Sequence, residues 1–198
     1  MQDAIRAGAV PVDTRALEPF AAGHLPGAVE IEFNLADLAE RAAMLIPRGV
    51  RVVVHAEPER AIAASVGLLQ DAGLEVCGHL EGGLAVWRAA GYPVATLPLA
   101  DVAELHADPA HHLVLDVREP YEFRHGRIPG AVLLPSGEAW DHDGGLVADG
   151  RPIAVICSGH ARAAFVASLL ARSGLPVRLV AGGMFEWERR GYPVVRGA

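Results

Sequence analysis

The sequence has little of what would direct a chain to the cell exterior, a membrane or a nucleic acid. Its two cysteines, Cys77 and Cys157, lie far apart and form neither a disulfide framework nor a metal-ligand spacing. No apolar run approaches the roughly 18 residues that span a bilayer, and residues 1–10 lack the pattern of a signal peptide. The 17 basic residues, against 24 acidic ones, form no stripe. We therefore expect a cytoplasmic protein that binds neither membranes nor nucleic acids.

The chain does contain enough apolar material for a packed core. Of its 198 residues, 52% are hydrophobic and 21% are charged, which excludes a disordered protein. At roughly 100–200 residues per domain, this length allows one large domain or two small ones.

An internal repeat decides between these possibilities. Motifs of the first half recur in the same order in the second half, at an offset of about 100 residues. The matching segments are Val12–Arg15 with Leu115–Arg118, Gly23–Val29 with Gly126–Val132, Gly82–Trp87 with Gly182–Trp187, and Gly91–Val94 with Gly191–Val194. We therefore predict two copies of one fold, joined near Ala95–Pro98, with domains at residues 1–96 and 97–198.

Each half alternates short apolar runs with helical stretches. The predicted strands are 10–13, 51–54 and 74–77 in the first half, and 112–117, 152–156 and 177–180 in the second. The predicted helices are 61–72 in the first half, and 119–124, 161–173 and 184–190 in the second. Apolar runs without alternation are typical of parallel strands that are covered on both faces. The sequence thus predicts an α/β fold in which each domain has a mostly parallel sheet flanked by helices.

One loop combines the features of a reactive cysteine. Cys157 follows an apolar strand directly and precedes a long predicted helix, which is where α/β sheets bind ligands. We expect the loop backbone to form an anion cradle, with the guanidinium of Arg162 beside it. The cradle residues are Ser158, Gly159, His160 and Ala161. These donors should lower the pKa of the Cys157 thiol and prepare it to attack sulfur, phosphorus or arsenic. The alternative is an unreactive cysteine that packs as a small buried hydrophobe.

Taken together, these motifs resemble the rhodanese family of sulfurtransferases, over nearly the whole chain, as two rhodanese-like repeats. The resemblance rests on Asp116–Glu119, Tyr121–Phe123, Gly126–Ala131, Cys157–Arg162, Gly182–Gly183, Trp187 and Gly191–Val194. It implies that Cys157 takes a sulfane sulfur from a small anionic donor, such as thiosulfate or a persulfide. The resulting persulfide would pass the sulfur to cyanide, a thiol or a protein acceptor. It also implies that the cradle and Arg162 bind the donor, and that no metal or organic cofactor is needed.

The loop departs from the family pattern at one position. His160 stands three residues after the cysteine, where many members have glycine, and Gly159 comes one residue earlier. His160 is therefore either a solvated loop residue or a hydrogen-bond donor to the anion.

Two other functions remain open. A phosphatase or arsenate reductase of the same fold would use a similar loop, but one residue longer, to hold a tetrahedral anion. The six positions from Cys157 to Arg162 therefore favour sulfur transfer. The second alternative is a non-enzymatic module that senses redox state or binds partners through Cys157.

The corresponding loop of the first half lacks a nucleophile. His55 stands at the position of Cys157, and Arg60 at the position of Arg162. Imidazole cannot form a persulfide, while Glu57 and Glu59 put negative charge where an anionic donor would bind. Pro58 also removes one backbone donor. We predict that this copy is non-catalytic, and no familiar ligand spacing makes His55 part of a metal site.

The remaining candidates receive structural interpretations. Asp116 and Arg118 recur as Asp13 and Arg15, which indicates a structural ion pair. Trp87 and Trp187 are predicted packing anchors, and Cys77 is predicted to lie in the core of the first half or, as the alternative, to act as a resolving thiol. The segment 141–145 is predicted to be a solvated turn near the mouth of the site.

Overall fold

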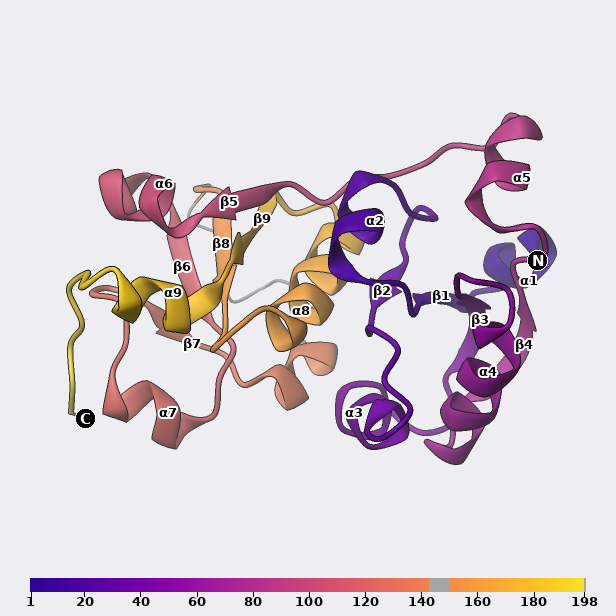
Figure 1. The fold of residues 1–198 in the computed structure, drawn as a ribbon, viewed down its shortest axis with the longest axis horizontal. Helices are drawn as coiled ribbons and strands as arrows, with labels where there is room; N and C mark the ends of the chain where they lie inside the picture. The colour runs from indigo at the N-terminus through magenta and orange to yellow at the C-terminus, as the bar shows by residue number, and fades with distance from the viewer. Residues whose placement is uncertain (143–149, 198) are drawn as a thin grey trace. The chain divides into compact units, whose positions relative to one another are not determined.

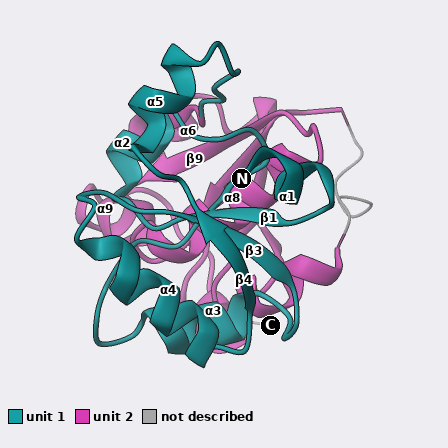
Figure 2. Cartoon of the chain, turned by 90° about the vertical axis from the view of Figure 1, so that its right-hand side faces the viewer, with its two compact units in different colours: residues 1–96 teal, residues 97–198 magenta. Residues whose placement is uncertain are grey.

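The computed structural model describes residues 1–142 and 150–197 (Figure 1). The chain divides into two compact units, Met1–Thr96 and Leu97–Ala198, which Figure 2 shows in different colours. Most of the predicted turn at 141–145 lies outside the described residues. None of the described helices has the length and apolar character needed to cross a membrane.

The first unit has a four-stranded parallel sheet in the order β2-β1-β3-β4. Its strands are β1 (Val10–Asp13), β2 (Val29–Glu30), β3 (Arg51–His55) and β4 (Glu75–His79). Its helices are α1 (Gln2–Arg6), α2 (Leu17–Ala22), α3 (Leu38–Leu45), α4 (Ala61–Asp71) and α5 (Gly83–Ala89).

The second unit repeats this plan and adds one strand. Its five strands are parallel, in the order β5-β9-β8-β6-β7. They are β5 (Leu99–Asp101), β6 (Leu113–Asp116), β7 (Val132–Leu133), β8 (Ile153–Ile156) and β9 (Val177–Ala181). The α-helices are α6 (Val102–Ala107), α7 (Pro120–His125), α8 (Ala161–Arg172) and α9 (Gly183–Arg189), and short 3-10 helices cover Pro109–His111 and Ser136–Asp141. The predicted fold class is thereby confirmed.

The central strand of the second unit is buried on both faces, as its sequence predicts. Every residue of β8 is buried, because helices cover both sides of the sheet. Ala154 and Ile156 belong to a hydrophobic cluster with side chains of α6 and α9. Val155 points to the opposite face by strand alternation, and α8 packs against β8 and β9.

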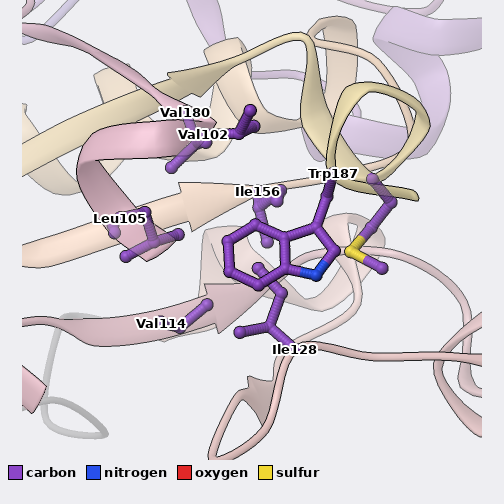
Figure 3. Close-up of a cluster of buried hydrophobic side chains, with 9 residues drawn as sticks. Val102, Leu105, Val114, Ile128, Ile156, Val180 and Trp187 are labelled. Carbon is purple, nitrogen blue, oxygen red and sulfur yellow. The ribbon is translucent and has the colours of Figure 1, made fainter. Parts of the chain in front are cut away.

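Trp187 lies at the centre of that cluster (Figure 3). Its side chain is buried, and its indole N–H donates to the Pro193 carbonyl at 2.9 Å. Trp87 donates in the same way to Pro93, at 2.8 Å, in the first unit. Each tryptophan therefore ties the Gly-Tyr-Pro segment to its own core, which confirms the prediction of two packing anchors.

The prediction that Cys77 is a core residue is wrong. Its side chain is exposed, because β4 is an edge strand and carries a β-bulge at this position. The register passes from Val52 paired with Val76 to Val53 paired with Gly78, so Cys77 is the extra residue. The aligned strand β9 is covered at its outer edge by β5, and Val177 is accordingly buried.

Candidate active site

Cys157 lies at the carboxyl end of the central strand of the second unit. β8 ends at Ile156 and α8 begins at Ala161, so only four residues form the intervening loop. β8 pairs with β6 on one side and β9 on the other. Adjacent parallel strands leave a crevice beyond their carboxyl ends, and the loop is placed where such sheets hold ligands.

Backbone N–H groups surround the thiol. The Cys157 side chain is only 2% exposed. The N–H groups of Gly159, Arg162 and Ala163 are directed at its sulfur. Of the residues predicted to form the anion cradle, 158–161, Gly159 is one of these N–H donors; Arg162 and Ala163 belong to the first turn of α8.

Contacts between the loop and α9 explain why the N–H of Gly159 points toward the thiol. Met184 N–H donates to the Cys157 carbonyl at 2.8 Å, and Phe185 N–H donates to the Ser158 carbonyl at 2.9 Å. A trans peptide directs its C=O and N–H to opposite sides. Because the Ser158 carbonyl is held against α9, the N–H of Gly159 faces the thiol.

Burial raises the pKa of the Cys157 thiol above its ordinary value. The N–H donors and the positive charge of Arg162 lower that pKa, but they offset the loss of water only in part. The prediction of a lowered pKa is therefore wrong. The sequence shows the donors that stabilise a thiolate, but it does not show how thoroughly the neighbouring side chains exclude water.

The guanidinium of Arg162 is engaged by a carboxylate from α7. Its Nη1 lies 2.6 Å from Glu122 Oε2, and its Nη2 lies 2.9 Å from Glu122 Oε1. Ser158 Oγ donates to the same carboxylate at 2.8 Å and also lies 3.0 Å from Arg162 Nη2. These contacts lower the pKa of Glu122 to about 2. The cradle thus contains a compensated ion pair rather than a bare positive charge.

Sequence reasoning did not assign Glu122 to the site. The residue stands in a motif that carried the family resemblance, but its partner is 40 positions away in the chain. The sequence did not show that Arg162 would be partly buried and would therefore require a counter-charge. Of the other predicted residues, Ala161 begins α8, and His160 is exposed at the N-cap position of that helix.

We expect the pH dependence of alkylation to report this balance of charges. In a Cys77→Ser background, the rate at which iodoacetamide modifies Cys157 should reach half of its maximum at a pH above that of an ordinary thiol. Only the thiolate reacts, so this midpoint pH follows the pKa of the thiol. Glu122→Gln should lower that midpoint, since it leaves the Arg162 charge uncompensated beside the sulfur. The measurement is the alkylation rate against pH, followed by mass spectrometry. A wild-type midpoint below that of free cysteine would contradict the expectation.

The first unit has a different arrangement at the corresponding position. His55 is buried between two carboxylates, with Nδ1 3.0 Å from Asp13 Oδ2 and Nε2 3.2 Å from Glu57 Oε1. Glu57 also lies 3.8 Å from Arg15. Among residues 1–142 and 150–197, no group of three or more histidine, cysteine or acidic side chains is arranged to hold a metal ion.

A buried ion pair occurs in both units at the end of a strand. Arg118 donates to Asp116 from Nε at 2.9 Å and from Nη2 at 2.6 Å. The corresponding distances from Arg15 to Asp13 are 2.9 and 2.7 Å. In each unit the arginine also donates to a glycine carbonyl at 2.7 Å. The two copies therefore share a structural ion pair, which we call the brace, as the sequence predicted.

A family model agrees with the division of the chain into two similar units. The family described as "Rhodanese-like domain" matches residues 1–90 and 99–190. A Mycobacterium tuberculosis protein named "Putative thiosulfate sulfurtransferase SseB" is 29% identical over 227 residues, covering 83% of this chain and 80% of its own. A solved "Probable Thiosulfate Sulfurtransferase" is 28% identical, covers 94% of this chain and 97% of its own, and has a TM-score of 0.43. The thiosulfate sulfurtransferase of Pseudomonas aeruginosa is 22% identical, with coverage of 100% and 42% and a TM-score of 0.43.

The repeat in the sequence, the two parallel sheets and the two matched segments lead to one conclusion: this chain belongs to the rhodanese family, as a tandem pair of rhodanese-like domains.

Proposed function

We propose that the second unit is a sulfurtransferase in which Cys157 carries the sulfur as a persulfide. The observation that carries this proposal is the ring of N–H groups from Gly159, Arg162 and Ala163 around a cysteine at the carboxyl end of the central strand. Such a ring stabilises negative charge on sulfur, both in the thiolate and in the persulfide anion.

The reaction has two displacement steps. The Cys157 thiolate attacks the outer sulfur of the donor, a new S–S bond forms, and the donor's own bond to that sulfur breaks. The leaving group departs with the electron pair; with thiosulfate it is sulfite. An acceptor thiolate then attacks the outer sulfur of the persulfide, and the Cys157 thiolate is regenerated. Cys157 is a free thiol in the structure, and a reducing cytoplasm would maintain that state.

The first unit has no catalytic role in this proposal. His55 occupies the position of the nucleophile, and the carboxylate of Glu57 contacts it from within the loop. An anionic donor would meet that negative charge there. We assign this unit a structural role.

Mass spectrometry after exposure to a donor tests the proposal. Wild-type protein treated with thiosulfate or an organic persulfide should gain about 32 Da at Cys157, the mass of one sulfur atom. Cys157→Ser should show no gain, and Cys77→Ser should behave like the wild type. An aryl phosphate, tested in parallel, should remain intact.

Two results would overturn the proposal. Hydrolysis of the aryl phosphate without sulfur uptake would favour a phosphatase that shares the fold. Failure of every sulfane donor to modify Cys157 would favour a partner-binding or redox-sensing module instead.

A further inference from the structure

A pocket of about 290 Å³ opens beside the Cys157 loop, between α7 and α9. Its lining includes Tyr121, Glu122, His125, Ser158, Phe185 and Glu188. Ser158 directly follows the nucleophile, and its carbonyl accepts the N–H of Phe185. A molecule in this pocket, which we call the α7–α9 pocket, would therefore border the loop that carries Cys157.

Two aromatic rings at the α7–α9 pocket are available to a ligand. Phe185 is 70% exposed and Tyr121 is 59% exposed, although both belong to helices that pack on the domain. Exposed ring faces attract cations, because the face of an aromatic ring carries partial negative charge.

The charges of the pocket favour the same kind of ligand. Arg118 is paired with Asp116, and Glu122 is paired with Arg162. Glu188 has no ion-pair partner in the part of the chain that the structure describes, and its carboxylate lines the pocket. An unpaired negative charge thus shares the pocket lining with two exposed aromatic side chains, a combination that suits an ammonium group.

Several residues that line this pocket are not shared by the two units, although the surrounding scaffold is. The brace arginine and its glycine acceptor occur in both copies, as Arg15 with Gly23 and Arg118 with Gly126. The ligand-facing positions differ: the first unit has Glu18, Ala22, Ala85 and Arg88 where the second has Tyr121, His125, Phe185 and Glu188. The aromatic rings and the free carboxylate therefore occur only in the copy that contains Cys157.

We propose that the α7–α9 pocket binds the organic part of a sulfur substrate that carries a cationic amine, either an aminothiol acceptor or the corresponding persulfide donor. This inference rests on the proposed function. In the acceptor direction, the aminothiolate attacks the outer sulfur of the Cys157 persulfide and the S–S bond breaks. Its electron pair returns to Cys157, and the product leaves as the amine hydropersulfide. The donor reaction is the reverse of this step, so both use the same pocket.

Three small thiols that differ in charge test this assignment. The full-length protein is first loaded with inorganic polysulfide and desalted, and the persulfide is then reacted with cysteamine, 2-mercaptoethanol or 3-mercaptopropionate. Sulfur transfer is followed as the loss of about 32 Da from Cys157. The rate for each thiol is then divided by the concentration of its thiolate form. We expect cysteamine, the cation, to have the highest second-order rate constant and mercaptopropionate, the anion, to have the lowest.

Variants of the pocket should change this order in a defined way. Glu188→Lys should lower the second-order rate constant for cysteamine by about 5–20-fold and raise it for mercaptopropionate, with a smaller effect at high salt. Phe185→Ala should lower the value for cysteamine by about 2–5-fold and affect mercaptoethanol less. Glu104→Lys makes the same charge change on α6, outside the pocket lining, and should leave the order of the thiols unchanged.

The outcomes distinguish the two proposals. If polysulfide fails to load Cys157, the sulfurtransferase proposal is wrong. If Cys157 loads and transfers sulfur, but Glu188→Lys leaves the ratio of the three thiols unchanged, only the amine assignment is wrong.

Discussion

Gly183→Ala is expected to lower sulfur transfer by at least about 100-fold, because catalysis is sensitive to displacements of about 1 Å at the reacting centre. A Cβ at this position would lie 2.6 Å from the Ser158 carbonyl oxygen and closer still to the carbonyl oxygens of Cys157 and Gly159. All three atoms are backbone, so no side chain can rotate away. The loop would have to move away from α9, and the N–H ring around the thiol would open.

The backbone of Gly183 adds a second cost. Its φ of +58° lies in the left-handed region, where a side chain costs about 1–2 kcal/mol. We expect reduced thermal stability together with loss of persulfide formation at Cys157, measured by thermal unfolding and by mass spectrometry.

Gly83→Ala is the matched control, since Gly83 is the equivalent residue of the first unit. Its φ is +63°, so the backbone cost is similar. The nearest atom to its added Cβ is Glu57 Oε1 at 2.8 Å, the end of a flexible side chain that can move. This variant should lose some stability but retain sulfur transfer. Equal losses of activity in both variants would show that the contact between Gly183 and the loop is not what positions Cys157.

Local sequence patterns predicted the parts of the structure that depend on neighbours in the chain. The repeat, the buried strand before Cys157 and the helix after it all follow from short motifs and from the periodicity of apolar residues. The brace between Asp116 and Arg118 was also predictable, because its partners are two residues apart and recur in the first copy.

The features that sequence reasoning missed arise from tertiary contacts. Glu122 meets Arg162 only because α7 packs beside the loop, and no spacing rule connects the two residues. The pKa of Cys157 depends on how far side chains from several elements exclude water from the thiol. Cys77 leaves the core because of a one-residue bulge, and a single residue shifts a strand's side chains to the other face.

Asp116→Ala is expected to destabilise the second unit by about 3–5 kcal/mol, the usual cost of removing one partner of a buried ion pair. The Asp116 side chain is fully buried and that of Arg118 is 7% exposed, so the remaining guanidinium would lose its counter-charge without gaining water. Among the described residues, the Gly126 carbonyl alone would still accept a hydrogen bond from it. For a domain of about 100 residues, such a loss lowers the melting temperature by about 12 °C or more.

The double variant Asp116→Leu with Arg118→Met separates charge from packing. It removes both charges and keeps apolar volume at the site, so its loss of stability should be clearly smaller than that of Asp116→Ala. Because the same pair occurs in the first unit, where His55 stands at the position of Cys157, we assign it to the scaffold rather than to the proposed chemistry. Folded Asp116→Ala protein at low temperature should therefore still acquire a persulfide at Cys157. A variant that kept its melting temperature but failed to load sulfur would instead place Asp116 in the reaction itself.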